Sequence, residues 1–255
     1  MAKRGKINEQ VRDVLERPHS KRHYKEFFLL VCEDESTEPY YFEKVFQEEF
    51  EKLLPKDTIR VEPVGTGRNS LGVVERAIAI INNRTETIPK EIDHVWVIFD
   101  KDDLGNNDTT RIRFEEAFIK AKENNIQVAY SNECFELWLL LHFVDIDGLS
   151  PIPRNIAEPE KYGDCLYGML QNSINAHLSV EKQILYSHKH HKKPYVSVSE
   201  LIKLIIQYGD EEKAIERAKR LDELHKHINP IDANPNTTVY KLVQELREWL
   251  HYYQY

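Results

Sequence analysis

Two short and uninterrupted apolar runs constrain the fold of this chain more than any other feature. They are FFLLVC at 27–32 and VWVIF at 95–99, and each is followed at once by an acidic residue. A continuous apolar run, in place of an alternating one, is typical of a strand that is buried on both faces. We therefore expect a parallel sheet with helices covering both of its sides.

Segments of helical and of strand-like pattern alternate between and after these runs. After Thr37, a candidate N-cap with Pro39 in the first turn, apolar residues recur at helical spacing as far as Leu53. The elements expected in chain order are strand 27–32, helix 37–53, strand 59–64, helix 71–81, strand 95–99, helix 114–121 and strand 126–130. This alternation predicts an open, Rossmann-like α/β sheet, mostly parallel and flanked by helices, with right-handed crossovers.

The pattern changes after Phe143. Prolines become frequent and no strong strand signal follows, whereas helical periodicity returns in three segments, 198–208, 211–227 and 238–252. Thr237 or Thr238 is expected to cap the last of these helices. We divide the chain into an N-terminal basic segment, 1–26, an α/β domain, 27–145, and a mostly helical C-terminal region, 146–255.

Charge and composition argue against several classes of protein. A formal net charge of -8 argues against a protein that coats nucleic acid nonspecifically, but it leaves room for an enzyme with a local basic groove. No apolar run approaches the roughly 18 residues that span a bilayer, and no apolar segment follows the basic N-terminus as in a secretory signal. Three scattered cysteines indicate buried free thiols in a reducing compartment. We expect a cytoplasmic protein without membrane contact.

Acidic residues follow both apolar strands at the edge of the sheet where ligands bind in parallel α/β proteins. Glu33 comes directly after the first run and Asp100 directly after the second. Asp102 lies two residues beyond Asp100, so both can point to the same side of the strand end. Carboxylates in such a cluster raise one another's pKa unless a cation is bound. The pattern predicts a site for Mg²⁺ or Mn²⁺, for which carboxylates, water and phosphate are the usual ligands.

Two of these acidic features have a second interpretation. Asp100, Asp102 and the neighbouring Asp103 also fit an acidic loop that precedes a helix starting near residue 109. Glu38 fits the first turn of a helix, where the macrodipole favours a carboxylate, as well as it fits a metal ligand.

Polar residues also follow the fourth strand and can face the same edge of the sheet. They are Asn132, Glu133 and Glu136. Glu136 stands next to Trp138 and a leucine run, so it also fits the polar side of a packed helix.

Basic residues that can contact a phosphate occur in two places. Arg68 follows the short glycine-containing segment 65–67 just before a helix, which suits a phosphate contact. Lys189, Lys192 and Lys193 alternate with histidines, and they fit either a contact with a phosphate backbone or a solvated basic loop.

Four long motifs resemble one known family. The stretches are LLVCEDESTEPYYF at 29–42, VWVIFDKDD at 95–103, VAYSNECFELWLLLHF at 128–143 and NPNTTVYKLV at 234–243. They are similar to the RloB family of Toprim-like, abortive-infection or restriction-associated proteins. The resemblance covers nearly the whole chain after the first 20 residues.

The resemblance implies a Toprim core like that of topoisomerases, primases and overcoming-lysogenisation nucleases. It places the strand-one glutamate at Glu33, the paired aspartates at Asp100 and Asp102, and a further metal-binding acid at Glu38. The wider superfamily usually has a glycine after the first glutamate, where this chain has Asp34. The resemblance also implies bacterial anti-phage defence beside a partner ATPase, and the chain itself lacks a GxxxxGK[ST] nucleotide-binding loop.

Two functional hypotheses follow from the sequence. In the first, the protein is a metal-dependent nuclease that cleaves RNA, with tRNA among the candidates, or DNA; Glu33 is a metal ligand or general base, and Asp100 and Asp102 are metal ligands. In the second, it is a noncatalytic Toprim-like subunit that docks on the partner ATPase and regulates it. The acids at the strand ends favour the first hypothesis, and the acidic net charge favours the second.

Overall fold

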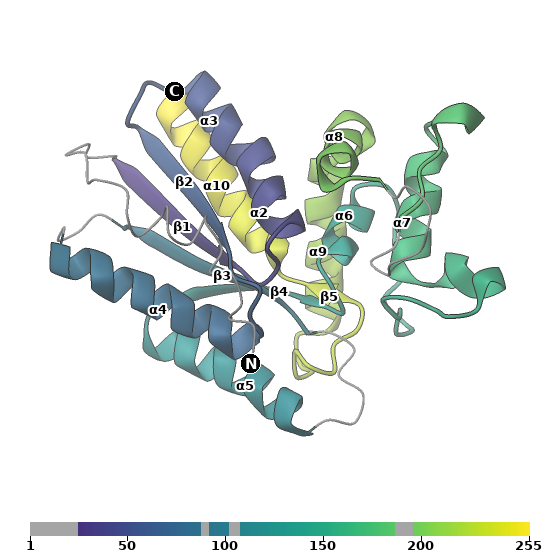
Figure 1. Ribbon diagram of the computed structural model, residues 1–255, viewed down its shortest axis with the longest axis horizontal. Coiled ribbons are helices and arrows are strands. Elements are labelled where there is room, and N and C mark those ends of the chain that lie inside the picture. Colours follow the sequence, from purple (N-terminus) through teal and green to yellow (C-terminus); the bar gives the residue numbers. More distant parts are fainter. Residues whose placement is uncertain (1–24, 88–91, 102–107, 187–195) are drawn as a thin grey trace, which may run out of the picture.

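The computed structural model describes residues 25–87, 92–101, 108–186 and 196–255. Within these ranges the chain forms one five-stranded sheet in the order β2-β1-β3-β4-β5, with helices on both faces (Figure 1). Strands β1 to β4 pair in parallel, and β5 pairs antiparallel with β4. The predicted α/β class, with a mostly parallel sheet flanked by helices and further helices towards the C-terminus, is confirmed.

The strands and helices lie close to the predicted positions. The strands are β1 (Glu26–Cys32), β2 (Ile59–Gly65), β3 (His94–Asp100), β4 (Gln127–Asn132) and β5 (Asn236–Thr237). The helices are α2 (Thr37–Phe42), α3 (Glu48–Leu53), α4 (Ser70–Thr87), α5 (Asp108–Glu123), α6 (Glu136–Leu141), α7 (Leu166–Asn175), α8 (Val198–Tyr208), α9 (Glu211–Leu224) and α10 (Val239–Gln254). Helices α2 and α3 are continuous through a π-helical turn at Glu43–Gln47, which together make the single helix that the sequence predicts there.

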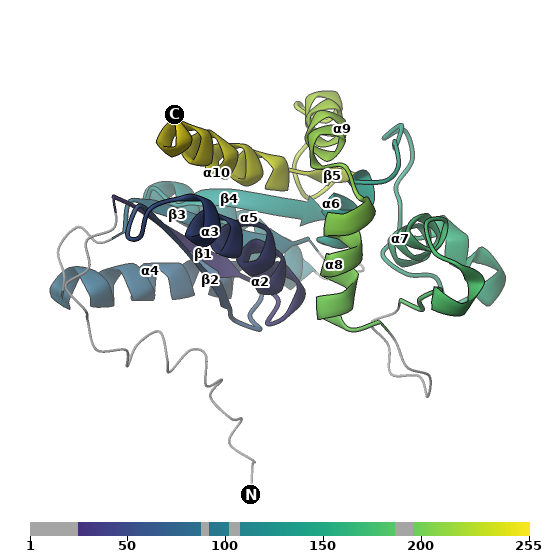
Figure 2. The ribbon, with the colours of Figure 1, turned by 90° about the horizontal axis from the view of Figure 1, so that it is seen from above.

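Two hydrophobic cores lie on opposite faces of the sheet. Successive residues of a strand point to opposite faces, so Phe28 and Leu30 of β1 enter one core while Leu29 and Val31 enter the other. Helices α4 and α5 cover the second face, whereas α2, α3 and α10 cover the first (Figures 1 and 2). This double burial explains why β1 is apolar at every position from Phe27 to Cys32.

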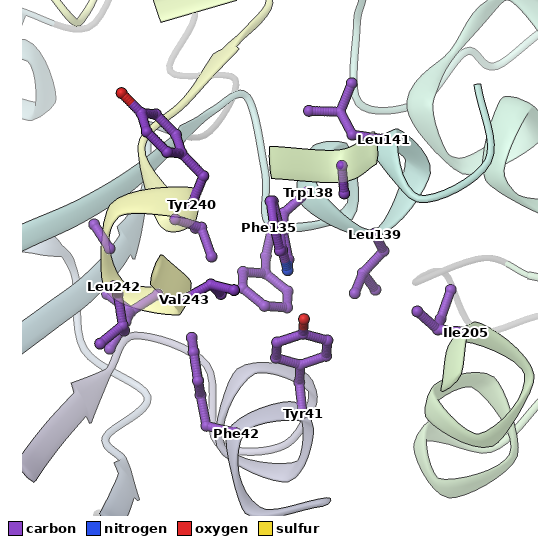
Figure 3. Close-up of a cluster of buried hydrophobic side chains, with 14 of the residues drawn as sticks. Tyr41, Phe42, Phe135, Trp138, Leu139, Leu141, Ile205, Tyr240, Leu242 and Val243 are labelled. Carbon is purple, nitrogen blue, oxygen red and sulfur yellow. The ribbon is translucent and has the colours of Figure 1, made fainter. Parts of the chain in front are cut away.

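The first core continues beyond the sheet into the C-terminal helices. Figure 3 shows aromatic side chains of α2, including Tyr41 and Phe42, packed near Phe135 and Trp138 and near residues of α10 such as Val243. Helices α6, α8 and α9 lie past the edge where the parallel strands end (Figures 1 and 2). The division of the chain at residue 145 stays a prediction. In the structure, β5 joins the sheet of the N-terminal part and α10 joins its first core.

Strand β5 is the main departure from the expected elements. The sequence gives no strand signal there, because only Asn236 and Thr237 pair with β4 and two residues are too few for a recognisable pattern. The two threonines that were expected to cap the last helix also serve the sheet. Thr237 Oγ1 contacts Ser131 Oγ at 2.9 Å, and Thr238 Oγ1 accepts the backbone N–H of Tyr130 at 3.0 Å. Thr238 occupies the N-cap position of α10 without a capping hydrogen bond from its side chain.

Two other expectations can be compared with the structure. Cys32, Cys134 and Cys165 are buried free thiols, as the sequence predicts. None of the helices in the described ranges combines the length and apolar character needed to cross a bilayer.

A partly buried ionic cluster ties α10 to the amino-terminal edge of the sheet. The His94 ring stacks on Phe28 at 4.1 Å between centroids, and its two nitrogens lie 3.0 Å from Glu26 Oε2 and 2.8 Å from Glu245 Oε1. Burial lowers the pKa of His94, but the hydrogen bonds and charges of Glu245 and Glu26 outweigh it, so the pKa is raised above its usual value. The charged imidazolium is therefore the form that the fold favours.

We expect the contribution of His94 to stability to depend on pH. The folded-state pKa is raised, so this contribution is complete below the unfolded-state pKa of about 6.5 and is lost as pH rises through the folded-state value. Urea unfolding of the wild type and His94→Gln from pH 6 to pH 9 should show a difference of roughly 1–2 kcal/mol at pH 6 that shrinks with increasing pH. A difference that stays constant across this range would contradict the assigned cluster.

Candidate active site at the carboxyl edge of the sheet

Glu33 and Asp100 meet where strands β1 and β3 end. The backbone N–H of Glu33 donates to the carbonyl of Ile98 at 2.9 Å, which continues the pairing of the two strands by one step. The Glu33 carboxylate then accepts the backbone N–H of Asp100 through Oε2 at 3.0 Å. The parallel register of β1 and β3 therefore brings together the two acids that the sequence singles out.

Asp34 caps the helix that starts next to these acids. Its carboxylate accepts the backbone N–H groups of Glu35 and Thr37, both at 2.7 Å. The sequence suggested Thr37 as the cap, and this assignment is wrong, because Ser36 holds the N-cap position and the free N–H groups turn to Asp34. Asp34 therefore stabilises the turn that carries Glu38.

Glu38 is a buried carboxyl surrounded by other acids. Only 1% of its surface is exposed, and Oε2 accepts the backbone N–H of Asp34 at 3.1 Å. Burial raises the pKa of Glu38 well above its usual value, and the charges of Asp100, Glu33 and Asp34 raise it further. Its second oxygen, Oε1, is buried without a hydrogen-bond partner among the described residues. Among the described residues, no group therefore offsets the burial of this oxygen by a hydrogen bond.

A tight loop after β2 borders the same acids. Thr66 donates to the carbonyl of Cys32 with its backbone N–H and its hydroxyl, and Gly67 donates to the carbonyl of Glu33 at 2.8 Å. Gly67 has a positive φ of 61°, which favours glycine. Arg68 follows this loop as an exposed residue, two positions before α4 begins.

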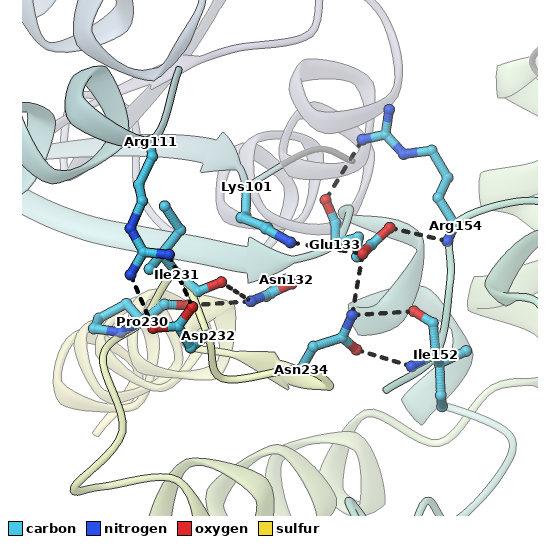
Figure 4. Close-up of polar contacts among 10 residues, drawn as sticks. All are labelled: Lys101, Arg111, Asn132, Glu133, Ile152, Arg154, Pro230, Ile231, Asp232 and Asn234. Carbon is cyan, nitrogen blue, oxygen red and sulfur yellow. Dashed lines mark hydrogen bonds and ion pairs between the residues drawn. The ribbon is translucent and has the colours of Figure 1, made fainter. Parts of the chain in front are cut away.

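The C-terminal region adds a cation that sequence reasoning missed. Arg154 Nη2 lies 3.4 Å from Asp100 Oδ2, and its backbone N–H donates to Glu133 Oε2 at 3.2 Å. Glu133 in turn accepts a hydrogen bond from Asn234 at 3.2 Å and lies 3.7 Å from Lys101 Nζ (Figure 4). Arg154 belongs to an irregular segment that follows two prolines, where no periodic pattern marks it.

The residues after β4 take different roles. Glu133 is connected to the candidate site because its carboxylate accepts the backbone N–H of Arg154. The Asn132 amide instead donates to the carbonyls of Pro230 and Ile231, both at 3.1 Å (Figure 4). Glu136 is buried and accepts the hydroxyl hydrogen bond of Tyr186. The interpretation of Glu136 as the polar side of a packed helix is wrong, because all six residues of α6 are buried.

The remaining predicted residues lie outside the described ranges. They are Asp102, Asp103, Lys189, Lys192 and Lys193. Within those ranges, no three His, Cys, Asp or Glu side chains are arranged closely enough to hold a metal ion. Glu33 instead turns to the Asp100 backbone, and Asp100 turns to Arg154. Glu33, Glu38 and Asp100 nevertheless interact at this edge, because the charges of Asp100 and Glu33 raise the pKa of Glu38.

Comparison with known proteins gives one match. The model of the family described as RloB-like protein matches residues 28–246 of this chain. Neither the curated proteins nor the solved structures include a match.

The close approach of the β2 loop to the acidic turn can be tested at Gly65. A Cβ atom there would lie 2.7 Å from the Glu35 Cα and 2.8 Å from the Asp34 carbonyl oxygen, so the backbone would have to move. We expect Gly65→Ala to lower the free energy of unfolding by about 1–3 kcal/mol in urea titrations. Gly163→Ala is the control, because its Cβ would meet only Asn172 Nδ2 at 3.4 Å. Equal stability of the two variants would refute this account of the loop.

Proposed function

Because the chain belongs to the RloB-like protein family, we propose that it is a metal-dependent nuclease that hydrolyses phosphodiester bonds of RNA or DNA. The bacterial anti-phage role and the partner ATPase that the family resemblance implies are parts of this proposal. So are the candidate substrates, among which tRNA, other RNA and DNA remain alternatives.

The observation that carries the proposal is the uncompensated carboxyl group of Glu38. A buried carboxylate is costly unless a cation or hydrogen bonds stabilise it. Glu38 has one oxygen without a partner among the described residues, and three further acids raise its pKa. The donor set consists of carboxylate oxygens, which suits a hard divalent cation such as Mg²⁺ or Mn²⁺. The chemistry of these donors therefore suits such an ion, although the described acids alone are not arranged closely enough to hold it and the proposed site requires further ligands.

We assign the metal-binding role to Glu33, Glu38 and Asp100, with Asp102 and Asp103 as further acids of the same loop. A divalent ion held there supplies Lewis acidity towards a phosphoryl oxygen and lowers the pKa of bound water. We propose Glu33 as a metal ligand or general base, because its carboxylate lies at the end of β1 and accepts the backbone N–H of Asp100. Glu136 lies deeper and keeps a supporting role through Tyr186.

Substrate binding requires positive charge beside these acids. Arg68 is exposed at the start of α4, next to the loop that hydrogen-bonds to Glu33. Lys189, Lys192 and Lys193 supply a second basic group in the sequence. A phosphate backbone attracts such side chains irrespective of base sequence, so these residues act in positioning rather than in sequence recognition.

Glu38→Gln should stabilise the metal-free protein and abolish its stabilisation by metal. The amide has nearly the shape of the carboxyl group but does not repel the neighbouring acids, so we expect a gain of about 1–3 kcal/mol in EDTA. Mn²⁺ should raise the midpoint of urea unfolding of the wild type and leave Glu38→Gln nearly unchanged. Glu123→Gln, at the exposed end of α5, is the control and should behave as the wild type in both conditions. Equal stabilisation of the wild type and Glu38→Gln by Mn²⁺ would remove Glu38 from the metal site.

Cleavage assays test the activity itself. The purified protein, alone and with an ATPase encoded beside it, is incubated with labelled tRNA, single-stranded DNA and duplex DNA in Mg²⁺ or Mn²⁺. We expect cleavage that EDTA abolishes and that Glu33→Gln and Asp100→Asn each reduce by about 100-fold or more.

The control variant for this assay is Asp57→Asn. Asp57 lies in the loop before β2, at the opposite edge of the sheet, and its positive φ of 63° is tolerated by asparagine. It should cleave as the wild type does. If the wild type and the site variants leave every substrate equally intact with and without the ATPase, the nuclease proposal fails and the noncatalytic docking subunit takes its place.

A further inference from the structure

Arg154 is held at the candidate site more firmly than a surface ion pair requires. Its backbone N–H donates to Glu133 Oε2 at 3.2 Å, and its carbonyl accepts the N–H of Tyr167 at 3.3 Å. The preceding residue is fixed as well, since the carbonyl of Pro153 accepts the N–H of Leu166 at 3.0 Å. The chain around Arg154 is thus tied both to α7 and to the end of β4.

A second clamp joins this segment to the C-terminal part of the sheet. The Asn234 side chain accepts the N–H of Ile152 at 3.0 Å and donates to the carbonyl of the same residue at 3.3 Å. It also donates to Glu133, so one amide side chain connects the segment to the residue that holds the Arg154 backbone (Figure 4). These contacts fix where the guanidinium group is delivered.

The positive charge of the Arg154 guanidinium group can serve both the metal-free site and the site with metal and phosphate bound. Without a metal, it lies 3.4 Å from Asp100 and partly offsets the crowded acids. This contact is at the long end of hydrogen-bond distances, and the Arg154 side chain is 28% exposed against 17% for Asp100. A partly exposed ion pair at this distance contributes only about 0–1 kcal/mol to stability, which is a weak reason for so many backbone hydrogen bonds around Arg154.

An anion that arrives beside Asp100 offers the guanidinium a better partner. Arginine presents several N–H donors in a planar fork that matches the oxygens of a phosphate. Once the acids are neutralised by a cation, the pairing of Arg154 with Asp100 is no longer needed for charge balance. A group whose backbone is already ordered loses little entropy when it binds such an anion.

We propose that Arg154 is a catalytic residue that binds the phosphate at the cleavage position, and that its contact with Asp100 is the resting arrangement of the same side chain. This inference rests on the nuclease function proposed above. It assigns to the C-terminal region a part of the active site that the sequence motifs around Glu33 and Asp100 do not contain.

The test compares Arg154→Met and Arg154→Lys with the wild type in three measurements. These are single-turnover cleavage at saturating Mn²⁺, Mn²⁺ affinity without nucleic acid, and affinity for an oligonucleotide in Ca²⁺, with thermal unfolding as a check on folding. We expect Arg154→Met to cleave about 100-fold more slowly, as when one transition-state donor is removed from an enzyme. Oligonucleotide affinity should fall several-fold, and Mn²⁺ affinity should stay equal or increase, because a competing cation has left Asp100.

Arg154→Lys should recover only part of the cleavage rate, since an ammonium group keeps the charge but not the fork. Arg111→Met is the matched control. Arg111 makes a two-bond ion pair with Asp232 near the same end of the sheet, at 3.0 and 3.2 Å (Figure 4). It should stay within about twofold of the wild type in all three measurements.

Three results would overturn the assignment. Wild-type cleavage by Arg154→Met would show that the side chain does not contact the reacting phosphate. Faster cleavage at limiting Mn²⁺ would show that Arg154 only competes with the metal, and loss of Mn²⁺ affinity together with thermal stability would show a purely structural role. If the wild type cleaves nothing, the proposed nuclease function fails, and the oligonucleotide affinities in Ca²⁺ still decide whether Arg154 binds phosphate.

Discussion

Mutual repulsion among carboxylates at the end of the parallel strands is the constraint around which this edge of the molecule is organised. The parallel register places Glu33 and Asp100 side by side, and the helix that follows β1 brings Glu38 to them in a buried position. Each nearby group reduces the cost in a different way. The Asp100 N–H satisfies Glu33, the Asp34 N–H satisfies one oxygen of Glu38, and Arg154 faces Asp100. Oε1 of Glu38 has no hydrogen-bond partner among the described residues, which is uncommon for a buried polar atom.

Polar contacts join the C-terminal region to this edge of the sheet, and the same contacts hold Arg154 at the candidate site. Glu133 holds the Arg154 backbone and lies near Lys101, and Asn234 connects both to the segment that returns to form β5. Strand β5 then pairs with β4, and α10 covers the first core of the sheet. The chain beyond residue 145 therefore does more than extend the protein. Its irregular segment places the Arg154 side chain next to Asp100 and is fixed there by backbone hydrogen bonds.

The sequence predicts those parts of the molecule that depend on local pattern. Strands β1 and β3 are recognisable because burial on both faces demands unbroken apolar runs, and Glu33 and Asp100 are recognisable because they follow these runs directly. Strand β5 escapes prediction because two residues make no pattern, and Asp34 replaces Thr37 as the cap because several nearby side chains compete for the same N–H groups. Arg154 escapes prediction for a different reason. Its contact with Asp100 spans 54 positions of the sequence, and its own segment has no periodicity.

Under the proposed function, the negative charge at the carboxyl edge of the sheet determines whether metal or phosphate binds first. A phosphate backbone approaching Glu33, Glu38 and Asp100 meets the same repulsion that raises the pKa of Glu38. Arg154 offsets only part of this charge, and the whole chain carries a formal net charge of -8, so long-range steering does not favour a polyanion. A divalent ion reverses the local sign and removes the need for Arg154 to stay on Asp100. Under the proposed function, metal binding is thus the step that converts an edge that repels phosphate into one that binds it.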